Sequence, residues 1–442
     1  MADLADPHMA SDPATGLSIA VPEGWAQLPQ EPDDEGFAPL VLAPAQWPDD
    51  FGFRPNVTVV AGMPVSPVPS VRLAGTRAMA AALATEDTRV IAYDVWPLPV
   101  GEGRRLVFAY FTGTTSVVAT QLVLVHDDRT VVVTASVDTD RYARLLPVVD
   151  ACLASVTFDP ASRAPEESTE AKDPTEPRPD EFWAARGEQL EDLTAVAPAQ
   201  PFPDEGLETT RAGLGILLEA GRGRVRTDRL DDAGRAAADE LVAGELLDRD
   251  GKLTEAGRGF VDVIASPQRH VRVEAAAGLA PLTFDAYWRG DRAVVVATEA
   301  PRRWAGRSAS GEDVAAMAHR VRLHVLPTSW LPVLLAAWLD VGPAWLAEPT
   351  PTVLPTALVT ARVDDPSTPQ PADADDILSA MWAQPWFMWT LQTSNEQAVA
   401  GIDVGRFGQL SLTQEEGDTD EARLTPWPAQ SLFATITALV LG

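Results

Sequence analysis

The sequence has few of the residues that covalent chemistry or membrane insertion require. It has a single cysteine, Cys152, so no internal disulfide can form and an oxidising compartment is not indicated. We interpret this thiol, which stands in an apolar stretch, as a small core residue rather than a nucleophile. No run of 18 apolar residues occurs, so no membrane-spanning helix is predicted. The opening MADLADPHMA lacks the basic and apolar regions of a signal peptide, and we therefore expect a cytoplasmic protein.

Basic residues are also scarce. The 442 residues include 34 basic and 64 acidic ones, and lysine occurs only as Lys172 and Lys252. The resulting net charge of −30 repels phosphate backbones and anionic membrane surfaces, so nucleic acid and membranes are poor partners. Apolar residues still make up 46% of the chain, which is enough to build cores, and the length favours two or three domains.

Motifs that carry catalysis are absent from the sequence. There is no GxGxxG after a strand, no GxxxxGK[ST], no HExxH, no GxSxG and no CxxC. The histidines are scattered, and His319 and His324 are spaced wrongly for a metal site on one helical face. The Asp-Asp pairs stand mostly at turns or helix starts, where aspartate caps free amides. We therefore expect no catalytic residue, no cofactor and no metal, although a hydrolase with dispersed Ser, His and Asp stays open.

The chain divides at a proline-rich, acidic stretch. Residues 160–180 contain almost no large apolar side chains, which predicts a flexible linker. Ahead of it we expect a disordered N-terminus over residues 1–14 and an α+β domain over residues 15–159, with an antiparallel sheet and flanking helices. The expected strands are 16–21, 56–60, 104–111, 117–125, 130–137 and 156–158, with a turn at Asp127-Asp128 and helices over 71–83 and 141–153.

The part after the linker, residues 181–442, contains a faint internal duplication. A helix, a proline, a strand, a hairpin and a further helix entered through prolines occur over about residues 231–345, and again over about 372–442. Pro267 and Pro385 occupy matching places in the two copies. We expect two α/β halves that share one sheet and are related by a pseudo-twofold axis.

A passage ahead of the first copy is similar to a winged helix. A helix is expected over Asp232–Ala243 with Asp232 as its cap, then a turn at 248–251 and a second helix capped by Thr254. This pattern leaves a transcriptional regulator as an alternative function. The acidic charge of the first of these helices favours a scaffolding role.

A cluster of large apolar residues in the second copy is the best candidate for contact with a partner. The candidate partner-binding residues are Trp382, Trp386, Phe387, Met388 and Trp389. In a strand, Trp386 and Met388 share one face, and Phe387 and Trp389 share the other. Both faces are therefore apolar, which indicates either a sheet covered on both sides or one face that awaits a partner.

The first domain resembles a known family in the order of its segments. GLSIAVPEGW near its start, the late hairpin LVLVHDDRTVVVTAS, a terminal helix and VTF together resemble PsbP-like and LpqN-type domains over residues 14–158. The resemblance implies an antiparallel sheet with flanking helices. Other members of that fold are binding or chaperone modules, which implies a role without catalysis.

The second part resembles the EspG family, cytosolic chaperones of actinobacterial type VII (ESX) secretion. The resemblance rests on ELVAGELLDRDGKLTEAGRGFVDVIASPQRHVRVEAAAG, on the strand pair AYWRGDRAVVVATE and on the repeated halves. It implies a quasi-twofold α/β domain that shields the apolar tip of a PE–PPE heterodimer or a related small helical substrate. We therefore expect a non-enzymatic chaperone or adaptor, with a regulator or an unrelated protein-interaction module as alternatives.

Overall fold

The computed structural model shows two compact units, Met1–Ala199 and Gln200–Gly442, called unit 1 and unit 2 below. The described residues are 8–12, 15–30, 39–48, 51–62, 70–98, 101–113, 115–127, 129–158, 191–278, 280–305, 319–345, 352–413 and 420–442. The predicted linker, residues 160–180, lies outside them. No helix in these ranges is long and apolar enough to cross a membrane. The fold is mixed α+β, as the sequence predicts.

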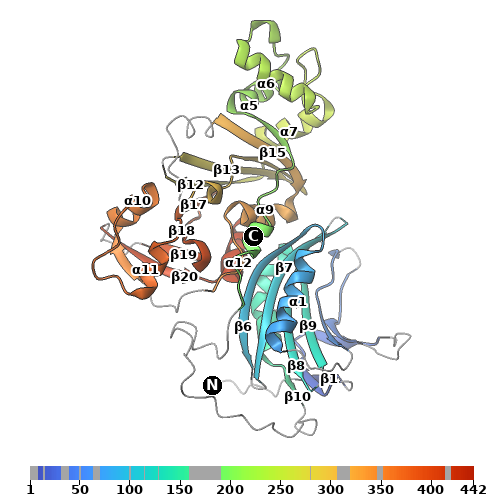
Figure 1. The fold of residues 1–442 in the computed structure, drawn as a ribbon. Coiled ribbons are helices and arrows are strands. Elements are labelled where there is room, and N and C mark those ends of the chain that lie inside the picture. Colours follow the sequence, from blue (N-terminus) through green and yellow to red (C-terminus); the bar gives the residue numbers. More distant parts are fainter. Residues whose placement is uncertain are drawn as a thin grey trace. The chain divides into compact units, whose positions relative to one another are not determined.

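Unit 1 is built on a seven-stranded antiparallel sheet with the strand order β3-β4-β5-β9-β8-β7-β6 (Figure 1). Its strands are β3 (Trp25–Leu28), β4 (Leu40–Pro44), β5 (Asn56–Ala61), β6 (Thr88–Leu98), β7 (Gly101–Thr112), β8 (Thr115–His126) and β9 (Arg129–Asp138). Strands β8 and β9 form the predicted hairpin, and Asp127 in its turn has a positive φ of 54°. Aspartate tolerates this conformation better than most residues, which is why it marks turns.

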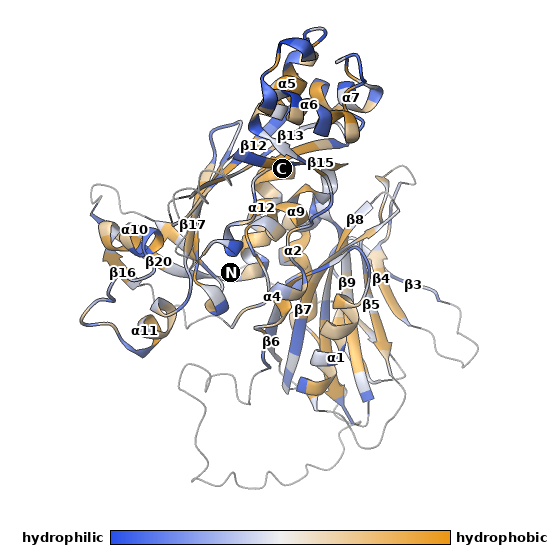
Figure 2. Ribbon diagram, turned by 45° about the horizontal axis from the view of Figure 1, so that its top comes forward, coloured by the Kyte–Doolittle hydropathy of each residue, from blue (hydrophilic) through white to orange (hydrophobic). Residues whose placement is uncertain are grey.

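Two helices cover opposite faces of this sheet. Helix α1 (Val71–Leu83) packs on β6, β7 and β8, while α2 (Thr139–Ala154) packs on β8 and β9. Arg104 of β7 stands opposite Val123 of β8, so its side chain lies on the α1 face, away from the Leu122 and Leu124 that pack with α2. Figure 2, coloured by hydropathy, shows that β4 and β5 of the same sheet are mostly hydrophobic.

The N-terminal residues are more ordered than the sequence suggests. Residues 1–14 are expected to be disordered, but Met9–Asp12 forms β1, which pairs with β2 (Leu17–Ala20) in a small sheet completed by β10 (Thr157–Phe158). The expectation is wrong there because Ala10 and Asp12 are buried. The hydroxyl of Thr15 donates to the Asp12 carboxylate at 2.6 Å and closes the turn between β1 and β2.

Residues 191–199 group with unit 1, so the division between the units lies later than the predicted domain start at residue 181. A buried ion pair between Glu191 and Arg104 explains why these residues belong to unit 1. Arg104 Nε donates to Glu191 Oε1 at 2.9 Å, and the hydroxyl of Tyr93 donates to the same oxygen at 2.8 Å. The side chain of Arg104 is 0% exposed and that of Glu191 is 4% exposed. Burial and the Glu191 charge raise the pKa of Tyr93, and the hydrogen bond to Glu191 raises that of Arg104 despite its burial.

Unit 2 contains a ten-stranded antiparallel sheet with the strand order β11-β15-β14-β13-β12-β17-β18-β19-β20-β16. The strands are β11 (Leu207–Thr210), β12 (Arg269–Ala277), β13 (Ala280–Arg289), β14 (Arg292–Ala297), β15 (Arg320–Pro327), β16 (Thr352–Pro355), β17 (Phe387–Thr393), β18 (Ala398–Asp403), β19 (Gln409–Thr413) and β20 (Glu421–Trp427). Outward from the central pair β12–β17, one side of the sheet runs β13, β14, β15 and then β11, and the other side runs β18, β19, β20 and then β16. Each edge strand, β11 or β16, has four residues and precedes the other strands of its side in the sequence. The order is therefore alike on the two sides of the central pair.

Each half of this sheet begins earlier in the chain than the predicted copies do. The edge strand β11 leads directly into α5 (Arg211–Ala220), and β16 leads in the same way into α10 (Thr356–Asp364). The halves therefore extend over about residues 207–338 and 352–441, rather than 231–345 and 372–442. The starting strands are four residues long, too short to show a clear alternation in sequence.

The helices cover both faces of the ten-stranded sheet. Helices α5 and α7 (Glu255–Ala265) bury one face through Val294, Val296 and other apolar residues of the same cluster. On the other face lies α9 (Leu331–Trp338), which packs with α12 (Ala429–Leu441). Trp338 of α9 contacts Phe284 of β13 with ring centroids 5.7 Å apart. All eight residues of α9 are buried, which explains its uniformly apolar sequence.

The winged-helix-like passage is an addition to the first half. Helix α6 (Asp232–Ala243) and a bridge between Leu247 and Leu253 lie between α5 and α7. The second half passes directly from α10 to α11 (Asp376–Trp382) through the polar loop 365–375. The cap of α6 is Asp231, whose carboxylate accepts from the amide of Gly234, and not Asp232 as expected. Thr254 caps α7 as predicted.

Candidate functional site: a charged cleft beside strand β15

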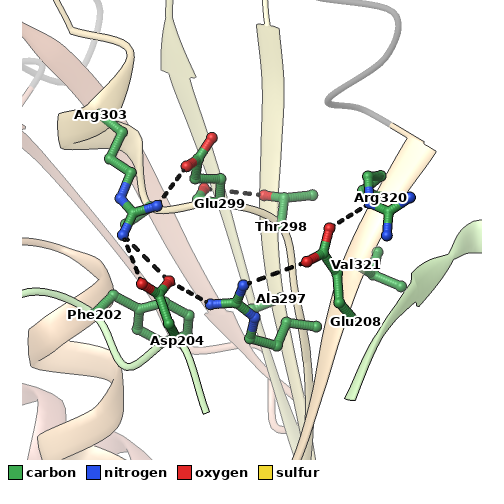
Figure 3. Close-up of a pocket in the computed structure, with 11 residues that line it drawn as sticks. Phe202, Asp204, Glu208, Ala297, Thr298, Glu299, Arg303, Arg320 and Val321 are labelled. Atoms are coloured by element: carbon green, nitrogen blue, oxygen red, sulfur yellow. Dashed lines mark hydrogen bonds and ion pairs between the residues drawn. The ribbon is translucent and has the colours of Figure 1, made fainter. Parts of the chain in front are cut away.

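A cleft of about 350 Å³ lies in unit 2 beside strand β15 (Figure 3). Its lining residues are Phe202, Asp204, Glu208, Ala297, Thr298, Glu299, Ala300, Arg303, Arg320, Val321 and Arg322. Three short stretches of chain supply them: the segment that leads into β11, the end of β14 with the turn that follows it, and the start of β15. Charged side chains dominate the lining, so the cleft is built for a polar or charged ligand.

Strand alternation places two of the arginines in the cleft. Arg320, Arg322 and His324 occupy one face of β15, and Val321 and Leu323 occupy the other. The two apolar side chains are buried in the core beneath α5 and α7. A sequence of alternating basic and aliphatic residues thus fixes the strand in one register and leaves its arginines on the other face.

Two carboxylates each bridge two of the guanidinium groups. Asp204 Oδ1 lies 2.7 Å from Arg322 Nη1 and 3.2 Å from Arg303 Nη2. Glu208 contacts Arg320 and also Arg322, the latter at 3.6 Å between Oε2 and Nη2. Figure 3 shows the resulting chain of ion pairs across the cleft. The hydrogen bond from Arg322 lowers the pKa of Asp204, which keeps this carboxyl ionised.

Glu299 holds the far side of the cleft. Its Oε1 accepts from Arg303 Nη1 at 2.8 Å, and its Oε2 accepts from the indole nitrogen of Trp304 at 2.7 Å. The hydrogen bond to Glu299 raises the pKa of Arg303, so this guanidinium stays charged. Since Glu299 fixes Arg303 from one side, the other side of the guanidinium is free to hold a second anion, which here is Asp204.

The preceding residue, Arg302, points away from the cleft into the interior. Its Nε donates to Asp340 Oδ2 and its Nη2 to Asp403 Oδ1, both at 2.6 Å. Asp403 also accepts from the amide of Gly405 and from Gln409 Nε2. Burial raises the pKa of Asp403 to about 7, while the charge of Arg302 opposes that rise. Two consecutive arginines thus have separate roles, one in the cleft and one in the core.

The arginines and carboxylates of the cleft are paired with one another. Among the described residues, no group of His, Cys, Asp and Glu is arranged to hold a metal ion. The cysteine is not part of the cleft. Cys152 is buried in unit 1, and burial raises the pKa of its thiol to about 12.

His324 lies below the cleft, and its ring has an unsatisfied atom. The side chain is 9% exposed and meets the ring of Phe202 edge to face, with centroids 5.4 Å apart. Its Nε2 has no hydrogen-bond partner among the described residues. Burial and the nearby charge of Arg322 lower its pKa to about 4, so the imidazole is neutral at pH 7.

We predict a loss of stability on acidification that depends on His324. Its folded pKa of about 4 lies below the value of about 6.5 in an unfolded chain, so the unfolded state binds the extra proton between these values. The stability of unit 2 therefore falls as the pH is lowered from about 6.5 to 4, by up to about 3 kcal/mol from this residue. Urea unfolding of wild type and His324→Gln at several pH values measures it. If the difference in unfolding free energy between wild type and His324→Gln stays constant from pH 6.5 to pH 4, the prediction is wrong.

The structure places the predicted partner-binding residues away from the cleft and mostly in the interior. Trp382, Trp386, Phe387 and Trp389 are at most 6% exposed, and Met388 is half-buried. The tryptophan nitrogens donate within unit 2, to Thr368 O from Trp382, to Met381 O from Trp386 and to Gln409 Oε1 from Trp389. The expectation of an exposed docking face is corrected for these four residues, which pack in the core. Met388 alone faces the sheet side that carries the exposed Thr390.

The cleft residues were not found by sequence reasoning. Arg320 and Arg322 are visible there as charges in a strand, but their acidic partners come from a segment more than a hundred residues earlier. The sequence offers one indication, the run Phe202-Pro203-Asp204-Glu205, in which an aromatic residue and two acidic residues stand just before the short strand β11. Nothing in the local pattern connects that run to β15, because the pairing of β11 with β15 is non-local.

Comparison with known proteins gives structural neighbours for part of the chain only. No family model and no curated protein sequence matches. Solved structures with a likeness include cyanobacterial PsbP from Synechocystis (16% identity, 36% of this chain and 97% of that chain, TM-score 0.28). They also include LpqN of Mycobacterium tuberculosis, involved in cell envelope biogenesis (14%, 35% and 91%, TM-score 0.27), and the Ran-binding protein Mog1p of Saccharomyces cerevisiae (12%, 36% and 99%, TM-score 0.27).

These likenesses agree in part with the expected resemblance. PsbP and LpqN are both among the neighbours, over about a third of the chain and at low TM-scores. None of the three neighbours is an EspG protein. The EspG resemblance of unit 2 therefore stays a prediction.

Proposed function

We propose that the chain is a non-enzymatic, cytoplasmic binding protein of type VII secretion, which holds a helical client such as a PE–PPE pair before export. The observation that supports the proposal is the strand order of unit 2, in which three consecutive strands and an earlier edge strand lie on each side of the β12–β17 pair. The EspG resemblance of the sequence implies two such halves. The paired charges of the cleft favour binding over catalysis.

The described surface suggests how a client is held. In unit 2 the exposed large apolar side chains among the described residues are Val325 and Val353, which are too few for an apolar docking face. The charged cleft lies in the same unit. We therefore infer that polar and charged contacts at the cleft set the affinity for the client, with apolar contacts in a smaller role.

The proposal predicts a complex that depends on the cleft. The full chain, co-expressed with PE–PPE pairs encoded in the same genome, is expected to co-elute with one of them in size-exclusion chromatography with light scattering. Arg303→Ala removes a cleft charge that is 42% exposed, and we expect about tenfold weaker binding by titration calorimetry.

A matched substitution far from the cleft separates this effect from a change in net charge. Arg249→Ala removes an exposed arginine in the turn that follows α6, and binding is expected to be unchanged. Absence of a complex with every such pair would refute the secretion role. A mobility shift of random duplex DNA by the wild type would instead favour the regulator alternative.

A further inference from the structure

The segment that leads into β11, residues 200–206, fills part of the cleft with few contacts of its own. It has no regular secondary structure, and Pro201 and Pro203 cannot donate backbone hydrogen bonds to β15. Phe202 is its buried anchor, against His324. Asp204 is its charged anchor, although the carboxylate side chain is 67% exposed. Arg322 Nη1 also donates to the carbonyl of Pro203 at 3.2 Å. The side-chain attachment of the segment in the cleft is therefore through one aromatic ring and one carboxylate.

The arginines that hold Asp204 are fixed without it. Arg303 is held by Glu299 at 2.8 Å, and Arg322 also contacts Glu208. Exposed ion pairs such as those of Asp204 contribute little to folding. The two guanidinium groups are therefore already placed to accept a carboxylate, and Asp204 is one that can be exchanged.

The opposite edge of the same sheet has a different residue pair at the matching position. There the register sets Arg423 of β20 opposite Val353 of β16, where the first half sets Arg322 opposite Glu208. Both edge strands pair over four residues. The register at the second edge thus places an aliphatic residue where the first edge has a carboxylate.

We propose that the cleft beside β15 is a binding site for an extended partner segment in which an aromatic residue stands two positions before a carboxylate, and that Phe202 and Asp204 occupy this site as an internal substitute. The ring of the partner takes the place of Phe202 over His324. Its carboxylate bridges Arg303 and Arg322. The remaining volume of about 350 Å³ accommodates the side chains around these two anchors.

The covalent link of the internal segment determines when the site is open. A tethered segment acts at an effective concentration on the order of millimolar, so a free peptide of the same sequence at micromolar concentration is excluded from the wild type. Weakening the internal anchors removes that competition. The site must then accept the same sequence when it is supplied in solution.

The test uses the chain's own sequence as a free probe. A fluorescent peptide of residues 199–206, AQPFPDEG, is titrated into the full-length protein and followed by fluorescence anisotropy. We expect the Phe202→Ala/Asp204→Asn variant to bind it at least about tenfold more tightly than the wild type does, and added salt to weaken the binding. Adding Arg303→Met to that variant is expected to abolish binding.

Two controls keep the test decisive. The peptide AQPAPNEG, which lacks both anchors, is expected not to bind, and Glu205→Gln, a change at an exposed neighbour, is expected to behave as the wild type does. If Phe202→Ala prevents folding, Asp204→Asn alone is expected to raise the affinity about threefold. Equal binding by wild type and variant, or binding of AQPAPNEG as tight as that of AQPFPDEG, would overturn the proposal. No PE–PPE client enters this test, so its result is independent of the secretion role.

Discussion

Replacing Glu191 by alanine is expected to lower the free energy of unfolding of unit 1 by about 3 kcal/mol. The substitution leaves the guanidinium of Arg104, which is 0% exposed, without the carboxylate that lies 2.9 Å from its Nε. It also removes the acceptor of the Tyr93 hydroxyl. Glu102 still contacts Arg104, which keeps the loss at the lower end of the range for a broken buried pair. In calorimetry, the transition of unit 1 is expected to fall by about 6–12 °C.

The control for this substitution is Glu86→Ala, which removes an exposed carboxylate from the same unit and is expected to change the stability by less than about 0.5 kcal/mol. A double variant, Arg104→Met with Glu191→Met, is expected to recover most of the lost stability because no unpaired charge stays buried. If Glu191→Ala unfolds at the wild-type temperature, residues 191–199 are not part of the folded unit 1.

This buried pair also shows why the domain boundary could not be located from sequence. Glu191 follows a proline-rich, acidic stretch and reads as one more exposed acid. Its partner, Arg104, stands between Gly103 and Arg105 near the start of β7 and reads as an exposed charge. Each residue alone is ordinary, and only the tertiary pairing shows that the chain returns to unit 1 after residue 190.

The predictable part of the fold is the part with strong local patterns. Helix α1 begins and ends at the predicted residues because Ser70 caps a run of helix-forming residues. The β8–β9 hairpin was likewise found, since two alternating runs flank an aspartate turn. The short strands β3, β4, β11 and β16 were missed because four or five residues do not establish a period. The 11-residue strand β6 was missed as well, because Arg89–Tyr93 are buried at consecutive positions and show no alternation.

The aromatic cluster shows the limit of reasoning from composition about sites. A run such as Trp386-Phe387-Met388-Trp389 is compatible with a core and with a docking face. The outcome depends on what covers the strand. Here the indole nitrogens of Trp386 and Trp389 find internal acceptors, so burial leaves no polar atom unpaired and the core is the stable location.

Arg302 is a half-buried charge of unit 2 that two carboxylates hold. It lies between the carboxylates of Asp340 and Asp403, and the latter is 1% exposed. Gln409 extends the network, because its amide donates to Asp403 and to the carbonyl of Leu339 and its oxygen accepts from Trp389. The network joins strands β17, β18 and β19 of the second half to the turn after β14 in the first half.

Replacing Arg302 by methionine is therefore expected to destabilise unit 2 by about 3–5 kcal/mol, because two carboxylates are left buried without a counter-charge. The stability that this variant loses depends on pH. The folded pKa of Asp403, about 7, lies above that of an unfolded carboxyl, about 3.9, so the folded state binds the extra proton and stability falls as the pH rises between these values. Without Arg302 this pKa moves higher still, and the variant continues to lose stability above pH 7, where the contribution of Asp403 in the wild type has levelled off.

The adjacent residue provides the matched control for this prediction. Arg303→Met removes the same side-chain type from the next position, but its ion pairs with Asp204 and Glu299 are on the surface, so a loss of about 0.5 kcal/mol is expected. Urea unfolding at pH 5 and pH 8 measures both variants. The difference between wild type and Arg302→Met is expected to be larger at pH 8, whereas the difference for Arg303→Met is expected to vary little. Equal losses from the two substitutions would show that Arg302 is solvated and that the interior network does not hold the two halves of the sheet together.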